Sequence, residues 1–151
     1  MSKVNYKNLL LKKNKSPITC LTAYSKPIAN LLDGKVDLIL VGDSVGTTLY
    51  GMKNTRGVTL EMMKNHGKAV VRNKKYSMSI IDMPYNTYRN KKEALKNAKE
   101  LIAFTKADFL KIETDKKNIE IVKHLSDNKI KVVSHIGVTP QKFSEIGRAH
   151  V

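Results

Sequence analysis

The chain of 151 residues contains no tryptophan, only one cysteine, and no apolar run long enough to cross a bilayer. Because Cys20 has no second cysteine to pair with, an internal disulfide framework is excluded and a reducing, cytoplasmic setting is expected. The polar N-terminal stretch lacks the apolar core of a secretory signal, so we expect neither export nor a membrane partner. With 41% hydrophobic residues, the sequence still supplies one ordinary core.

Acidic residues are scarce. The chain has 13 of them against 28 basic residues, which gives a formal net charge of +15. A basic module that binds nucleic acid is one interpretation of this excess. However, 24 of the basic residues are lysine and four are arginine, the residue preferred for bidentate recognition of phosphates and bases. The lysines are also scattered along the chain, so we favour a solvated surface and no nucleic-acid partner.

Apolar residues alternate between strand-like and helix-like spacing along the whole chain. Strands are expected at 16–23, 36–42, 77–84, 108–114 and 130–140. Helices are expected at 5–15, 25–34, 59–73, 90–105 and 118–128. Residues 47–58 contain two glycines and no apolar period, so we expect a long loop there. Alternating strands and helices predict an α/β protein with a parallel sheet.

Two α/β architectures fit this order, an open doubly wound sheet and a (β/α)8 barrel. The chain has neither G-x-G-x-x-G after its first strand nor G-x-x-x-x-G-K-[ST], so the nucleotide-binding doubly wound fold lacks its usual support. A barrel typically needs about 250 residues. Five predicted strands would therefore make an incomplete barrel.

Ionisable or polar residues follow four successive predicted strands at the end where each strand stops. They are Asp43, Ser44, Asp82, Lys111, Glu113 and His135. Each has an ordinary structural explanation when taken alone, such as a helix cap, a turn residue, a surface ion pair or a buried histidine. The carboxyl ends of parallel strands meet at one edge of the sheet, where the active sites of α/β proteins are found. Four successive strands that all end in ionisable or polar residues therefore favour a functional site over four separate structural roles.

Three of these residues are carboxylates, and three carboxylates in one place repel each other unless a cation lies between them. Magnesium binds through one or two carboxylates, keeps several waters and shares its remaining positions with substrate oxygens. The lysine would supply a positive charge for an anionic substrate. The sequence therefore predicts a magnesium-dependent site for an anionic substrate, with no role for Asp115 or His66.

Six segments make the chain recognisable when they are taken together and in order. They are "ITCLTAYS" (18–25), "LVGDSVGTTLYG" (40–51), "VTLEMMKNH" (58–66), "IDMPYNTY" (81–88), "FLKIET" (109–114) and "SHIGVTPQ" (134–141). With these motifs the chain resembles the ketopantoate hydroxymethyltransferase family. The resemblance covers most of residues 18–141.

The resemblance implies a (β/α)8 TIM barrel of which about the first five units are present, in a homo-oligomer that is often a decamer. It implies transfer of a hydroxymethyl group from 5,10-methylenetetrahydrofolate to 3-methyl-2-oxobutanoate, giving 2-dehydropantoate on the route to pantothenate and coenzyme A. It also implies Mg²⁺, with Asp43, Asp82 and Glu113 as the metal-associated carboxylates.

By the same resemblance, the keto acid contacts Asp43, Ser44, Asp82 and Lys111, and His135 lies at the same rim. The catalytic base of the family is a glutamate in the second half of the barrel, which this chain does not reach. We therefore expect no catalytic base here and an inactive isolated chain. A rival interpretation is another magnesium-dependent α-keto acid barrel, of the phosphoenolpyruvate mutase and isocitrate lyase group, but its cysteine-containing signature is missing.

The last six residues, "IGRAHV" (146–151), fall outside the resemblance. One back-translation of this hexapeptide matches the start of a common sequencing adapter. We therefore expect residues 1–145 to be the N-terminal part of a single barrel and 146–151 to be a non-native tail, with a genuine, divergent C-terminus as the alternative interpretation.

Overall fold

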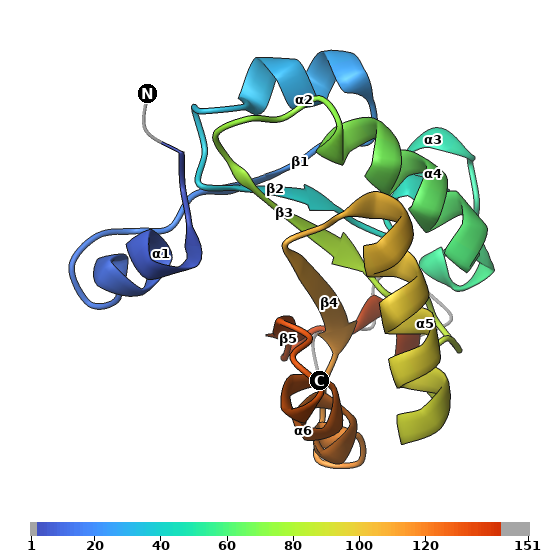
Figure 1. The fold of residues 1–151 in the computed structure, drawn as a ribbon. Helices are drawn as coiled ribbons and strands as arrows, with labels where there is room; N and C mark the ends of the chain where they lie inside the picture. Colours follow the sequence, from blue (N-terminus) through green and yellow to red (C-terminus); the bar gives the residue numbers. More distant parts are fainter. Residues whose placement is uncertain (1–2, 143–151) are drawn as a thin grey trace.

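A computed structural model describes residues 3–142 of the chain (Figure 1). Its centre is one sheet of five parallel strands in the sequential order β1-β2-β3-β4-β5. The strands are β1 (Cys20–Thr22), β2 (Leu38–Val41), β3 (Met78–Asp82), β4 (Phe109–Glu113) and β5 (Val132–His135). A doubly wound sheet reverses its strand order at a switch point, and this sheet does not. The sheet has the strand order of a (β/α) barrel, which confirms the expected fold class.

Helices connect the strands, and four of them lie in a row along one face of the sheet (Figure 1). These four are α2 (Lys26–Leu32), α4 (Leu60–Val71), α5 (Lys91–Thr105) and α6 (Ile119–Asp127). Polar caps set where two of them begin, because Thr59 and Asn90 each accept a hydrogen bond from a backbone N–H in the first turn. Helix α5 ends at Lys106, which has a left-handed backbone with φ of 62°.

The main core lies between the sheet and this row of helices. Strand residues that point outward, such as Ile39, Ile81 and Leu110, are fully buried there. Gly67 allows α4 to approach the sheet, since a Cβ atom at this position would lie 2.4 Å from Ile81 Cδ1 and 3.0 Å from Thr105 Cγ2. This close approach explains a glycine in the middle of a helix, where it otherwise costs about 1 kcal/mol relative to alanine.

The opposite face of the sheet has an apolar end and a polar end. At the strands' amino ends, Met78, Ile80 and Phe109 form a second cluster with Leu9 of α1 (Tyr6–Lys12), which lies apart from the other helices (Figure 1). Side chains two residues apart on a strand share a face, so Asp82 follows Ile80 on this same surface. This face, which we call the inner face of the sheet, therefore changes from apolar to charged along the strands.

The structure corrects the expected boundaries in several places. Residues 47–58 are not a continuous loop, because they contain most of α3 (Val45–Leu49) and the 3-10 helix η1 (Thr55–Gly57). A helix of five residues is too short to show an apolar period, which is why the pattern missed it. The strands at both ends of the sheet are shorter than expected. The proposed tail, 146–151, lies outside the described residues.

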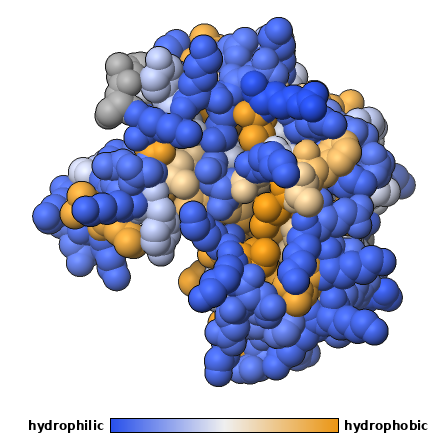
Figure 2. Space-filling view, viewed as in Figure 1, coloured by the Kyte–Doolittle hydropathy of each residue, from blue (hydrophilic) through white to orange (hydrophobic). Residues whose placement is uncertain are grey.

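Two edges of the sheet have one neighbour each within residues 3–142, namely β1 and β5. Leu21 on β1 and Leu31 on α2 leave more than half of their surface exposed. Elsewhere hydrophilic residues cover most of the visible surface, with apolar residues gathered in a band near its middle (Figure 2). No helix within the described part of the chain is long and apolar enough to cross a membrane.

Candidate active site at the carboxyl ends of the strands

The turn after β2 places Asp43 and Ser44 at the carboxyl end of the sheet. Gly42 makes the turn possible, because a Cβ atom there would lie 2.9 Å from Ser44 Oγ and 3.6 Å from Asp82 Oδ2. Ser44 is the N-cap residue of α3, but its side chain makes no capping hydrogen bond. Its hydroxyl instead lies 2.7 Å from the Tyr24 hydroxyl. Asp43 is not the cap of this helix, so the structural explanation considered for it does not hold.

Asp82 and Lys111 form an ion pair at the ends of β3 and β4. The two residues are register partners, and Lys111 Nζ lies 2.8 Å from Asp82 Oδ2. The Asp43 backbone N–H donates to the same oxygen at 3.1 Å. Asp82 is 2% exposed, and this burial raises its pKa to about 6, against the opposing effect of Lys111 and with a further rise from Asp43.

Glu113 lies on the same face as Lys111, as its spacing of two residues predicts. It is buried, and the Gln141 backbone N–H donates to its Oε1 at 3.0 Å. Burial raises the pKa of Glu113, the hydrogen bond from Gln141 opposes the rise, and the negative charge of Asp43 adds to it. The structure thus holds two carboxyls with raised pKa values at neighbouring strand ends.

Three buried side-chain atoms at this end of the sheet have no hydrogen-bond partner in the described part of the chain. They are Asp82 Oδ1, Glu113 Oε2 and His135 Nδ1. Buried polar atoms in proteins are nearly always paired, so such atoms call for an explanation. Unpaired carboxylate oxygens are the hard ligands that Mg²⁺ prefers, and one or two carboxylates suffice for it. The residues present therefore fit a magnesium ion.

The expected three-carboxylate metal cluster is not formed in this arrangement. No group of three or more His, Cys, Asp or Glu side chains within residues 3–142 could hold a metal ion together. The physical reason lies in what separates the carboxylates. Lys111 Nζ holds Asp82, while the side-chain amide of Gln141 donates to Asp43 Oδ2 at 2.6 Å. Asp43, Asp82 and Glu113 belong to one hydrogen-bonded network without forming a common cage.

His135 pairs in register with Glu113, and its Nδ1 lies 4.0 Å from Glu113 Oε1. Burial lowers the pKa of His135, and the positive charge of Lys111 lowers it further. The two residues given no role have structural partners. Asp115 accepts hydrogen bonds from the backbone N–H groups of Lys117 and Asn118.

His66, the second residue given no role from the sequence, also has structural partners. Its Nδ1 lies 2.8 Å from the Tyr24 carbonyl oxygen, and its Nε2 lies 2.9 Å from the Tyr50 hydroxyl.

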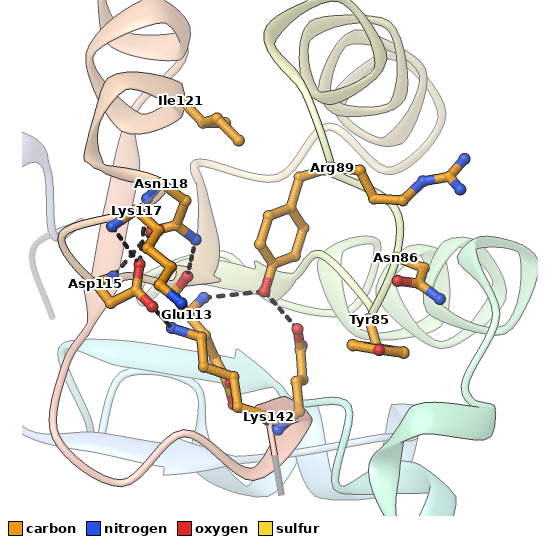
Figure 3. A pocket seen from close by; sticks show the side chains of 11 residues that line it. Tyr85, Asn86, Arg89, Glu113, Asp115, Lys117, Asn118, Ile121 and Lys142 are labelled. Atoms are coloured by element: carbon orange, nitrogen blue, oxygen red, sulfur yellow. Dashed lines mark hydrogen bonds and ion pairs between the residues drawn. The ribbon is translucent and has the colours of Figure 1, made fainter.

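A cavity of about 310 Å³ opens beside this network (Figure 3). Its lining includes Glu113, Tyr88 and Gln141 but not Asp43, Asp82 or Lys111. Lys117, Asp115 and Asn118 gather on one side of it, while Arg89 points away from Glu113 (Figure 3). The buried carboxylates and Lys111 are better candidates for binding and catalysis than the residues that line the cavity alone. The cavity and the carboxylate network share only Glu113, Tyr88 and Gln141.

The sequential parallel strands, with charged side chains at their carboxyl ends, define a barrel-type α/β protein. The family model of ketopantoate hydroxymethyltransferase matches residues 3–151, and the chain belongs to this family. It is similar to the 3-methyl-2-oxobutanoate hydroxymethyltransferase of Pelagibacter ubique, with 54% identity over 134 residues, covering 89% of this chain and 52% of the relative. The Rhizobium etli protein of the same name is 45% identical over 136 residues, covering 89% and 50%. The chain spans about half the length of the curated relatives it matches.

Two solved structures resemble the fold at low sequence identity. One is 2,3-dimethylmalate lyase, described as a member of the PEP mutase/isocitrate lyase superfamily, with a TM-score of 0.61 and 15% identity over 82% of this chain and 49% of that one. The other is oxaloacetate acetylhydrolase in complex with oxalate, with a TM-score of 0.59 and 12% identity over 78% and 46%. At such identities the likeness supports the barrel fold alone.

Three residues of the network were assigned no role from the sequence. They are Tyr24, Tyr88 and Gln141. Each lies inside one of the six family-like segments, at a position with an uncharged side chain. Tyr24, Tyr88 and Gln141 were missed because only ionisable residues at strand ends were considered. Their positions within the family-like segments were the one feature of the sequence that could have indicated a role.

Proposed function

We propose that the chain supplies the keto-acid half of a 3-methyl-2-oxobutanoate hydroxymethyltransferase. The whole enzyme would transfer a hydroxymethyl group from 5,10-methylenetetrahydrofolate to 3-methyl-2-oxobutanoate, giving 2-dehydropantoate for pantothenate synthesis in the cytoplasm. The observation that carries this proposal is the buried Asp82–Lys111 pair, whose Asp82 Oδ1 has no partner, at a strand end in a chain of this family.

The roles of the side chains follow from their positions. Lys111 is 17% exposed at its side chain and offers its ammonium to the carboxylate of the keto acid. Ser44, oriented by the Tyr24 hydroxyl, donates a hydrogen bond to the same carboxylate. His135 has an unpaired Nδ1 at the rim, where it can contact substrate. The carboxylates of Asp43, Asp82 and Glu113 beside these groups are buried, which strengthens each charge interaction among them.

Asp82 and Glu113 would hold Mg²⁺ through the two carboxylate oxygens that have no partner, with Asp43 beside them. When bound, the ion would polarise the ketone of the substrate and favour loss of the proton at C3. The base that removes this proton belongs, in the proposal, to the other half of the barrel. General-base help is worth about a hundredfold to ten-thousandfold, so the 151-residue chain alone should not turn over. The proposed assembly of the whole enzyme is a homo-oligomer.

A chimeric enzyme tests the proposal, because the chain spans about half of its relatives. Residues 1–142 are joined to the remaining half of the Pelagibacter ubique relative, and that relative is measured alongside. The chimera should form 2-dehydropantoate and exchange the C3 proton of 3-methyl-2-oxobutanoate for deuterium when Mg²⁺ is present.

Two variants of the chimera, and the chain alone, complete the test. Asp82→Asn should abolish turnover, and the control Glu100→Gln, at an exposed carboxylate on α5, should leave it unchanged. The 151-residue chain alone should be inactive. A folded chimera that forms no product, or one that keeps full turnover with Asp82→Asn, would contradict the proposal.

A further inference from the structure

We propose that Gln141 is a positioning residue that orients the Asp43 and Glu113 carboxylates for a divalent cation. The inference rests on the proposed function, because it gives a purpose to the network only if a metal binds there. Gln141 lies in η2 (Pro140–Lys142), after β5, and is 3% exposed. It is the one glutamine in the chain, and its side chain is uncharged.

Every polar group of Gln141 that faces the site is engaged. Its Nε2 donates to Asp43 Oδ2 at 2.6 Å and to the Met83 carbonyl oxygen at 3.1 Å. Its backbone N–H donates to Glu113 Oε1 at 3.0 Å. Its Oε1 accepts a hydrogen bond from the Tyr88 hydroxyl. One residue thus joins three strand ends, through its side chain to Asp43 and Met83 and through its backbone N–H to Glu113, and its amide is fixed on both sides.

Tyr88 extends the same arrangement to the backbone of β4. Its hydroxyl accepts a hydrogen bond from the Glu113 N–H at 3.3 Å while it donates to Gln141. An amide group has a donor and an acceptor end that cannot be exchanged. Because the Asp43 carboxylate and the Met83 carbonyl only accept hydrogen bonds, the Nε2 end must face them and Oε1 must face Tyr88. The tyrosine hydroxyl therefore holds the amide from its other side.

The consequence is that the carboxylates are held without being neutralised. Asp82 and Glu113 each have one oxygen bonded to a protein donor and one buried oxygen with no partner, and Asp43 Oδ2 is held by the Gln141 amide. Lys111 is the cation paired within this network, and it contacts Asp82. The neutral side-chain amide of Gln141 orients Asp43 and its backbone N–H orients Glu113, and both leave the carboxylate charges for a cation. Groups that hold metal ligands in this way typically matter 10-fold to 100-fold in metal affinity.

The test measures Mn²⁺ binding to the 151-residue chain by electron paramagnetic resonance, with Mn²⁺ as the probe in place of Mg²⁺. Gln141→Met keeps the length of the side chain and the backbone N–H to Glu113 but removes all three hydrogen bonds of the side-chain amide, to Asp43, Met83 and Tyr88. Its Mn²⁺ dissociation constant should rise about 10-fold to 100-fold. Tyr88→Phe removes the hydroxyl alone and should give a smaller rise. Asn73→Ala removes an amide that donates to the Ala69 carbonyl oxygen at 2.7 Å on α4, and serves as the matched control.

Urea unfolding of the same variants separates positioning from simple structural support. Asn73→Ala should lower stability without changing the dissociation constant. Gln141→Met should change the dissociation constant while its unfolding remains cooperative. Gln141→Met binding Mn²⁺ as tightly as the wild type would overturn the inference and leave the proposed function intact. A folded wild-type chain with no saturable Mn²⁺ binding would overturn the proposed metal site and the inference together.

Discussion

The two ends of the sheet treat the same type of residue in opposite ways. At the amino ends, Asp37 accepts hydrogen bonds from Lys12 and Thr19, and Asp108 accepts them from Lys74 and Ser79. At the carboxyl ends, Asp82 and Glu113 each keep a buried oxygen with no partner in the described part of the chain. The first arrangement is what a folded protein needs for its own stability, and the second leaves capacity for a ligand.

The pKa values follow the same division. Burial raises the pKa of Asp108, but hydrogen bonds from Lys74 and Ser79 outweigh burial and hold this pKa below its ordinary value. Asp37 behaves alike, with Lys12 and Thr19 outweighing burial to lower its pKa. For Asp82 burial prevails, and the pKa rises to about 6 in spite of Lys111. A carboxyl whose pKa is raised by burial beside a specific charge partner is a candidate functional group, because its charge is poorly compensated by the protein.

The largest expected effect contrasts two inner-face positions on neighbouring strands. Phe109 is 7% exposed in the apolar cluster and packs against Tyr6 of α1, with ring centroids 6.1 Å apart. Phe109→Ala should lower the free energy of unfolding by about 3–5 kcal/mol, because it leaves a cavity. His135→Ala, at the polar end, should cost under about 1 kcal/mol, since the imidazole Nδ1 has no partner to lose. Urea unfolding measures both, and equal losses would show that the two ends do not differ.

A smaller effect is expected when one carboxylate at each end is made neutral. Asp108→Asn leaves Lys74, whose side chain is 9% exposed, without its charge partner and should cost about 3 kcal/mol. Asp82→Asn removes a charge whose burial already opposes folding, so stability at neutral pH should be unchanged or increased. Thermal unfolding of both variants in metal-free buffer gives the comparison. A loss in Asp82→Asn as large as that in Asp108→Asn would mean that the Lys111 pair is a structural element.

The fold could be predicted from the sequence because its signal is repeated. Buried strands such as 36–42 and amphipathic helices such as 90–105 recur in alternation, and only a parallel sheet accommodates that order. Boundaries were less reliable, since strand ends depend on hydrogen-bond partners that are distant in sequence. The short helix Val45–Leu49 follows from the turn at Gly42 and not from any period.

The site could be predicted in part, for a similar reason. Strand ends meet at one edge of a parallel sheet, so Asp82 and Lys111 could be placed together before their distance was known. What sits between the carboxylates could not be predicted. Gln141 comes from the turn after β5, 98 residues from Asp43, and no local pattern encodes a contact of that kind. The sequence could therefore place the carboxylates at one edge of the sheet, but it could not predict the amide that contacts Asp43.

The smallest expected effect is a pH dependence that arises from Asp82 alone. Its pKa is about 6 in the folded chain and 3.8 when unperturbed, so between these values the folded state holds a proton that the unfolded state has released. Unfolding then releases a proton, and the contribution of Asp82 to stability falls as pH rises through this window. Between about pH 5 and pH 7 the loss is about 1 kcal/mol.

The dependence is isolated by subtracting the unfolding free energy of Asp82→Asn, measured by urea titration in metal-free buffer at each pH. Asp37 and Asp108, with lowered pKa values, titrate below this window and contribute a constant amount to both proteins. The lowered pKa of His135 acts in the opposite direction, because its unfolded form holds the extra proton, and this contribution is present in both chains. The wild type should therefore lose stability relative to the variant as pH rises from about 5 to 7. A difference that stays flat, or that grows in favour of the wild type, would show that Lys111 compensates the Asp82 charge fully, and the contrast between the two ends of the sheet would then disappear at this residue.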